Sequence, residues 1–130
     1  MNCFKKGLGL MALLVLTAGC FEHNPVLPVH DEVLVYNLPY DLTYLRVVEG
    51  LQSVAGWDLD ITLKESGLVR VRNLDYSGLD DADKRTVTFL VKRIESRKTS
   101  VELMPESQQT LGSGDLLKAV ANELSQEVPK

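Results

Sequence analysis

The sequence predicts an α+β domain in which an antiparallel meander sheet carries two helices on one face, in the order β-α-β-β-β-β-α. Two stretches, residues 41–55 and 114–127, repeat apolar residues at spacings of three and four, which is typical of amphipathic helices. Residues 57–104 between them hold short apolar alternations separated by turn residues, which is typical of hairpins. Since every element offers one apolar side, helices and sheet are expected to bury those sides against each other.

The first strand and the first helix follow directly from this pattern. Residues 33–38 (VLVYNL) are β-branched and aromatic-rich and end at Pro39, and both parities are apolar, so we expect a central strand. In the helix over 41–55, Asp41 is the expected N-cap and Gly56 the expected residue beyond the end. The buried face of this helix is expected to contain Leu42, Leu45, Val48, Leu51 and Ala55.

Residues 57–63 and 68–73 predict a hairpin with one wet face. The residues expected on its buried side are Trp57, Leu59, Ile61, Leu63, Val69 and Val71. The charged residues expected to pair across the two strands on the wet side are Asp58, Asp60, Arg70 and Arg72. An active-site role for the two aspartates is the alternative interpretation.

Residues 75–85 (DYSGLDDADKR) predict an acidic loop. Several carboxylates close together suggest calcium, which binds several oxygen ligands at once. The spacing does not match the twelve-residue calcium loop with its central glycine and terminal glutamate, so we expect a solvated loop and no metal.

Residues 86–96 (TVTFLVKRIES) are ambiguous. Alternation of Val87, Phe89 and Val91 favours a strand, whereas a helical stripe through Phe89 and Ile94 gives the alternative, a ferredoxin-like βαββαβ unit followed by a C-terminal helix. The strand is preferred. Residues 99–104 then predict the last strand. The final helix, 114–127, is expected to be capped by Ser113 and buried through Leu117, Val120, Ala121 and Leu124.

Residues 1–19 have the layout of a secretory signal. Lys5 and Lys6 precede an apolar run over residues 8–17, which is shorter than the ~20 residues needed to span a bilayer. Small residues, Ala18 and Gly19, follow at the expected cleavage site.

Residues 16–20 (LTAGC) resemble the lipobox of bacterial lipoproteins. The resemblance implies cleavage between Gly19 and Cys20, a diacylglycerol thioether on Cys20 and acylation of the new amine. Phe21, in place of an aspartate, implies sorting to the outer membrane. Residues 20–31 are then a tether and residues 32–130 one domain, which resembles small bacterial lipoproteins that place two helices against one antiparallel sheet. That likeness implies no activity.

Composition limits what the mature chain can do. Removing the signal leaves 12 basic and 18 acidic side chains, a formal charge of −6, which argues against a nucleic-acid partner. Cys3 leaves with the signal and Cys20 is the lipid site, so no disulfide forms within the domain. Both histidines, His23 and His30, lie in the expected tether, and no nucleophile–base pair, Gly-rich phosphate loop or Cys/His cluster occurs.

These features predict a lipid-anchored envelope module that is not an enzyme, needs no cofactor, and contacts another protein through its open sheet face or an edge strand. One alternative is a small-ligand carrier with an apolar pocket between sheet and helices. Another is an envelope hydrolase that uses Asp58, Asp60 or the acidic loop. The densest basic group could orient the anchored domain on anionic headgroups, or pair instead with Glu95 and Glu102; it comprises Lys92, Arg93, Arg97 and Lys98.

Overall fold

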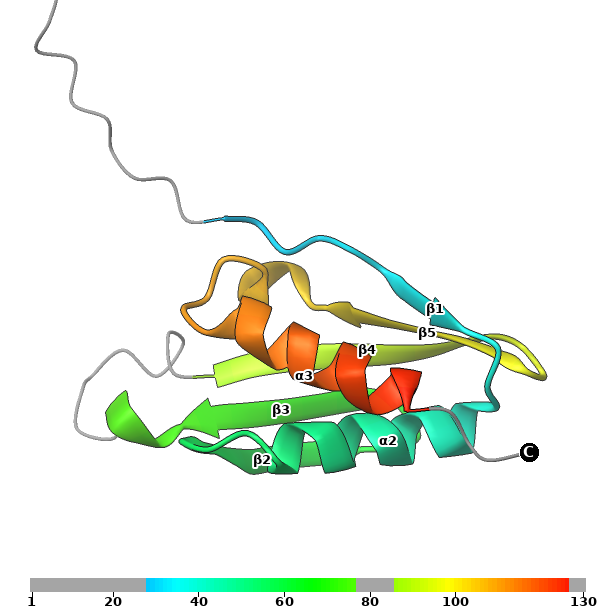
Figure 1. Cartoon of the computed structure of the whole chain (residues 1–130), viewed down its shortest axis with the longest axis horizontal. Coiled ribbons are helices and arrows are strands. Elements are labelled where there is room, and N and C mark those ends of the chain that lie inside the picture. The colour runs from blue at the N-terminus through cyan, green and yellow to red at the C-terminus, as the bar shows by residue number, and fades with distance from the viewer. Residues whose placement is uncertain (1–27, 77–85, 127–130) are drawn as a thin grey trace, which may run out of the picture.

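The computed structural model describes residues 28–76 and 86–126, which form a five-stranded antiparallel sheet with two helices on one face (Figure 1). The elements are β1 (Leu34–Tyr36), α2 (Tyr40–Gln52), β2 (Trp57–Leu63), β3 (Leu68–Asn73), β4 (Thr86–Glu95), β5 (Lys98–Leu103) and α3 (Ser113–Ser125), with short 3-10 turns at Leu74–Tyr76 and Pro105–Ser107. The predicted fold class and element order are confirmed. The predicted signal, Cys20 and most of the acidic loop lie outside the described residues.

The sheet has the strand order β1-β5-β4-β3-β2. Strands β2 to β5 form the expected meander, and α2 carries the chain from β1 at one edge to β2 at the other. The prediction that the first strand is central is wrong, because β1 lies at the edge of the sheet and β5 is its one partner among the described strands. Leu34 and Tyr36 of β1 face the helices and pack against the core. Val35, between them, points to the uncovered side of the sheet and is 48% exposed, so β1 has apolar residues on both faces although it is an edge strand.

The ambiguous segment is a strand. Strand β4 pairs with β3 on one side and β5 on the other, so the ferredoxin-like alternative is excluded. Its alternating residues Val87, Phe89 and Val91 are buried. Two-residue periodicity therefore outweighs the helical stripe, because β4 fills the centre of a sheet that has one covered face.

The hydrophobic core lies between the sheet and the two helices. Its largest fully buried side chains come from both layers: Val47, Leu51, Val69, Val71, Val87, Phe89, Val101, Leu103, Leu116 and Val120. On α3, Leu117, Val120 and Leu124 are buried as predicted, but Ala121 is only partly buried and Leu116 takes its place.

The buried face of α2 differs from the prediction. The buried residues are Thr43, Tyr44, Val47, Gly50 and Leu51, while Leu45 is 52% exposed and Ala55 lies beyond the helix end. The helix is turned because it packs against α3 as well as the sheet. At Gly50 an added Cβ would lie 3.1 Å from Cβ of Glu123, so a residue that looks like a helix weakness is the point of close helix contact.

Neither predicted N-cap is a cap. Helix α2 starts after Pro39, which makes no side-chain capping bond, and Asp41 sits in the first turn. Helix α3 starts at Ser113 itself, after Gly112 at φ +86°, and the buried Ser113 hydroxyl has no hydrogen-bond partner. Gly56 has the expected positive φ, +85°, but in the turn that follows Ser53 rather than directly at the helix end.

A β-bulge interrupts β2 and changes which residues face the helices. Leu59 pairs with Val71, but Ile61 pairs with Arg70, so one residue is inserted at Asp60. The alternation therefore reverses, as bulges require. The prediction that Ile61 and Leu63 are buried with Trp57 is wrong: both turn to the uncovered face of the sheet, and Leu63 is 49% exposed.

Candidate interaction surface

The uncovered face of the sheet carries a row of leucines. In the strand register Leu63 lies opposite Leu68, and Leu68 lies opposite Leu90. Leucines of the three adjacent strands β2, β3 and β4 therefore form one row across the sheet. The neighbours of Leu68 and Leu90 along their strands, such as Val69 and Phe89, are fully buried on the helix side. Alternation therefore directs the three leucines away from the core.

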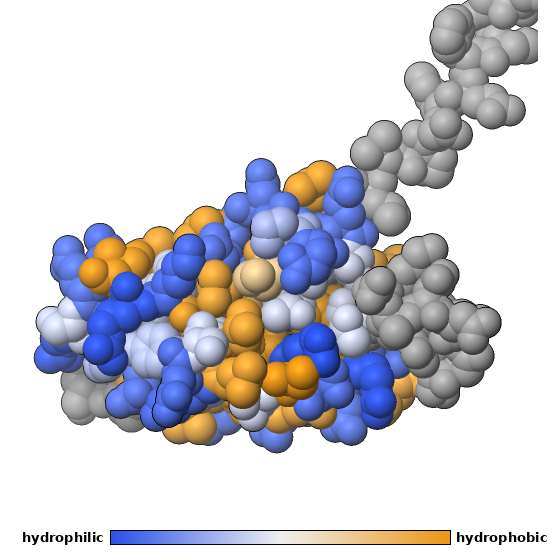
Figure 2. Space-filling model, turned by 180° about the vertical axis from the view of Figure 1, so that it is seen from behind, coloured by the Kyte–Doolittle hydropathy of each residue, from blue (hydrophilic) through white to orange (hydrophobic). Residues whose placement is uncertain are grey.

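Ile61 lies two residues before Leu63 on the same face. We call Ile61, Leu63, Leu68 and Leu90 together the leucine band. Figure 2, which views the molecule from behind, shows apolar side chains gathered across the middle of this face with hydrophilic side chains on both sides. No described helix covers it (Figure 1). Contiguous apolar surface of this kind marks binding sites on soluble domains.

Charged residues beside the leucine band are paired with one another. Arg70 Nε donates to Asp60 Oδ2 at 2.8 Å, and Asp58 lies directly opposite Arg72, which confirms the predicted cross-strand arrangement. On the other side of the band, Lys92 Nζ lies 3.2 Å from Glu102 Oε1. The open face is thus an apolar stripe between compensated charges, as at protein–protein interfaces.

The four basic residues of the β4–β5 region do not form one patch. Lys92 lies on the open face, whereas Arg93, opposite the buried Thr99, lies on the helix face with its guanidinium 5.4 Å from the Tyr40 ring centroid. Arg97 is in the β4–β5 turn and Lys98 begins β5, opposite Glu95. Only the last two share the hairpin tip.

The hairpin tip and the point where the chain enters the domain lie at opposite ends of the molecule (Figure 1). The first described residue is Pro28. Seven residues lie between it and Cys20, and the eight steps from residue to residue, at ~3.3–3.6 Å each, give a reach of at most ~29 Å. The entry end is therefore the part of the domain held nearest an anchor at Cys20.

His30 belongs to the folded domain and not to a solvated tether. Its backbone N–H donates to the Gln108 carbonyl at 3.0 Å, and its Nδ1 lies 3.7 Å from Glu32 Oε1. The ring packs so closely on Gly114 that a Cβ there would lie 2.6 Å from it. The tether prediction failed for this residue because prolines indicate extended backbone but not whether that backbone is packed.

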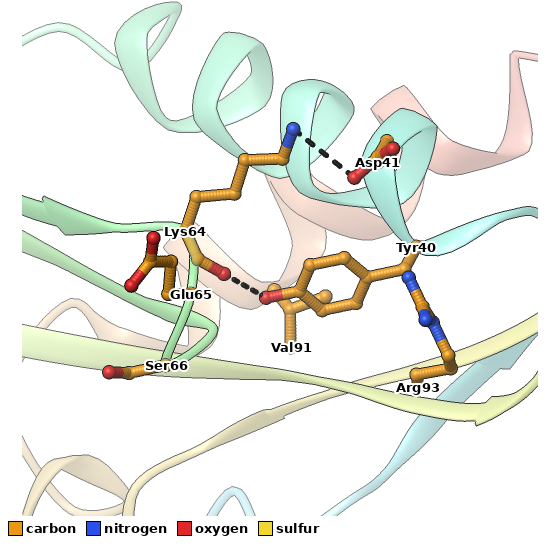
Figure 3. Close-up of a pocket in the computed structure, with 7 residues that line it drawn as sticks. All are labelled: Tyr40, Asp41, Lys64, Glu65, Ser66, Val91 and Arg93. Atoms are coloured by element: carbon orange, nitrogen blue, oxygen red, sulfur yellow. Dashed lines mark hydrogen bonds and ion pairs between the residues drawn. The ribbon is translucent and has the colours of Figure 1, made fainter.

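A groove of about 660 Å³ lies at the start of α2 (Figure 3). The Tyr40 ring forms one wall of this groove. The Tyr40 hydroxyl donates to the Lys64 carbonyl, and the ring stacks on the ring of Tyr44, with 6.1 Å between the two ring centroids. Burial raises the pKa of Tyr40, and the positive charges of Lys64 and Arg93 act in the opposite direction. Burial likewise raises the pKa of Tyr44, whose hydroxyl donates to the Leu68 carbonyl at 3.0 Å.

A second groove of about 610 Å³ runs between α2 and the outer end of β2. Leu42, Tyr44, Leu45 and Val48 of α2 form most of its lining, and Asp41, Thr62 and Lys64 complete it. Both grooves share the ion pair in which Lys64 Nζ lies 3.1 Å from Asp41 Oδ1. The sequence predicts neither groove, and the second depends on the bulge in β2, which no motif or alternation indicates.

The residues considered for other chemistry are dispersed. Within residues 28–76 and 86–126, no group of three or more His, Cys, Asp or Glu side chains is arranged to hold a metal ion. Asp60 is engaged by Arg70, and the Asp75 N–H donates to the Asn73 side-chain oxygen at 2.9 Å. The interface between sheet and helices is filled by side chains such as Leu51, which is fully buried.

No helix in the described ranges has the length and apolarity needed to cross a membrane. Sequence comparison finds no protein-family model and no curated protein that matches the chain.

Proposed function

We propose that the protein is a non-enzymatic interaction module of the bacterial cell envelope, anchored by lipid on Cys20, with an outer-membrane destination favoured by Phe21. Its partner is another envelope protein, which binds the open face of the sheet. The single observation that carries this proposal is the leucine band, which lies on a sheet face that no described element covers.

The physical reason is the free energy of covering apolar surface. Removing apolar area from water contributes ~25 cal/mol per Å², so a partner that covers the band gains from every side chain in it. The flanking pairs Asp60–Arg70 and Lys92–Glu102 are partly exposed and compensated, so they suit the polar rim of an interface. The anchor adds to this by confining both proteins to one membrane surface.

The test is affinity purification from detergent-solubilised envelope with the full-length protein and the variant Leu90→Lys. A lysine at this position meets Glu102 directly across the strand pair, so the sheet should fold while the band is interrupted. We expect a protein that copurifies with the wild type to be lost from Leu90→Lys.

The matched control is Leu111→Lys, which changes a leucine that is 59% exposed and lies before α3, away from the sheet face. It should retain the partner. Copurification that survives Leu90→Lys, or is lost equally in both variants, would contradict the assignment of the open face.

A further inference from the structure

The bulge in β2 leaves a set of apolar residues on α2 without a cover. Trp57 and Leu59 pack against the core, and unbroken alternation would turn Ile61 and Leu63 toward α2 as well. The inserted residue at Asp60 instead puts Thr62 on the helix side, opposite the buried Val69. A small polar side chain thus stands where two large apolar ones would have been.

The consequence is the 610 Å³ groove. Leu42, Leu45 and Val48 line its α2 side, and Leu45 is 52% exposed there. Its other side is the end of β2, an edge strand whose outer side pairs with no described strand. An apolar groove therefore runs beside the outer side of β2, residues 57–63, which has no described strand partner, and this is the arrangement that receives an added strand.

Side chains of both signs line this end of the two adjoining grooves, where Asp41 and Glu65 accompany Lys64 and Arg93, and the two basic groups can meet an acidic ligand group. Among the described residues the Lys64 ammonium pairs with Asp41, the two side chains are 56% and 73% exposed, and exposed ion pairs of this kind contribute little to stability. Arg93 lies in the adjoining groove, with its guanidinium 5.4 Å from the Tyr40 ring centroid (Figure 3). The ring fixes its position and leaves its N–H groups able to meet a carboxylate.

We propose that this groove is a second binding site, separate from the leucine band, for an extended peptide segment of another protein. The segment adds as a strand beside residues 61–63 at the outer side of β2. Alternate apolar side chains fill the space that the bulge leaves over Leu42, Leu45 and Val48, and an acidic residue of the segment lies against Lys64 and Arg93.

The peptide is favoured over a fatty acid or a second copy of the chain by these observations. A fatty acid would match the apolar lining and the basic end, but would leave the β2 edge unpaired. A second copy joined antiparallel at β2 with Asp60 at the centre would bring two Asp60 carboxylates together, which is destabilising. Only a strand from another chain uses the edge, the lining and the charges at once.

The test selects peptides from a random dodecapeptide phage library on a chain lacking residues 1–20, which keeps every core residue. We expect enriched sequences to carry apolar residues at alternate positions and an acidic residue at one end. Affinities of the enriched peptides are then measured by fluorescence polarisation. Methylation of alternate peptide backbone nitrogens on the edge that faces β2 should abolish binding, because it removes the strand hydrogen bonds.

Two variants locate the site. Thr62→Leu fills the groove, so it should raise the thermal unfolding temperature and lower peptide affinity about tenfold, the effect of excluding roughly one apolar side chain. Arg93→Gln should lower affinity about threefold for an acid-ended peptide and leave a glutamine-ended one unchanged. The matched control is Thr88→Leu, which adds the same groups on the open face and should leave affinity unchanged.

The proposal is overturned if no sequence is enriched, if enriched peptides bind Thr62→Leu as well as the wild type, or if methylation has no effect. Laurate binding that Thr62→Leu removes, without any peptide binding, would assign the groove to a lipid. Concentration-dependent dimers that the same variant dissociates would assign it to a second copy. Since Thr62 and Arg93 both lie on the helix side of the sheet, Thr62→Leu and Arg93→Gln leave the leucine band unchanged, and their outcome is independent of the open-face test.

Discussion

The turn between β2 and β3 depends on one glycine, and replacing it tests the packing of the whole β2–β4 region. Gly67 has φ +75° and lies against β4, where its carbonyl accepts from the Val91 N–H at 2.7 Å. A Cβ added to Gly67 would lie 2.0 Å from the Val91 carbonyl oxygen and 3.2 Å from the Tyr40 hydroxyl. The first distance is far inside van der Waals contact with backbone, so β3 and β4 must separate at this point.

We therefore expect Gly67→Ala to lower the free energy of unfolding by about 2–5 kcal/mol, from left-handed backbone strain of ~1–2 kcal/mol and the loss of a buried hydrogen bond at ~1–3 kcal/mol. The assay is urea unfolding of a chain lacking residues 1–20, followed by fluorescence of Trp57, the single tryptophan. The loss is a large part of the ~5–15 kcal/mol typical of a domain.

Gly56→Ala is the matched control. Gly56 has φ +85°, but the nearest atom to an added Cβ is Asp75 Oδ2 at 3.7 Å, so only the strain of ~1–2 kcal/mol applies. If Gly67→Ala is no more destabilising than Gly56→Ala, the steric part of the reasoning is refuted.

Three further outcomes are expected. Cys20→Ala should abolish labelling by a palmitate analogue and release the protein from the membrane fraction, and a variant that stays labelled contradicts the lipid site. Because the pKa of Tyr44 is raised in the folded state, its contribution to stability is complete below about pH 10 and is lost as pH rises beyond that. Between pH 9 and 11 the free energy of unfolding should therefore fall less in Tyr44→Phe than in the wild type, as urea unfolding at each pH would measure. In a chain lacking residues 1–20, replacing Arg97 and Lys98 by glutamine should weaken sedimentation with anionic vesicles by about 1 kcal/mol per residue at low salt, and the absence of any salt-sensitive binding by the same chain without these replacements rules that contact out.

The parts of the fold that depend on a single buried face could be predicted from the sequence. Val87, Phe89 and Val91 alternate because β4 is covered on one side only, and that alternation was enough to choose strand over helix. The meander order followed from the turn residues between strands. The paired charges of Asp60 and Arg70 could also be predicted, since cross-strand neighbours follow from hairpin register.

What the sequence did not predict depends on packing between elements. Helix α2 buries Val47 and Gly50 in preference to Leu45, because its contact with α3 at Gly50 sets its rotation. The bulge at Asp60 leaves no signal in an alternating pattern, yet it moves Leu63 to the open face and opens the α2 groove. Both candidate binding surfaces thus depend on one inserted residue.

Binding of a partner to the open face can be measured by photo-cross-linking in living cells, with benzoylphenylalanine in place of Leu90. We expect one discrete cross-linked envelope protein at this position. It also predicts no such product when the photo-reactive residue replaces Leu111, and loss of the product when Cys20 is changed to alanine. Equal cross-linking from both positions, or a product that persists without the anchor, would contradict a lipid-anchored module that binds through its leucine band.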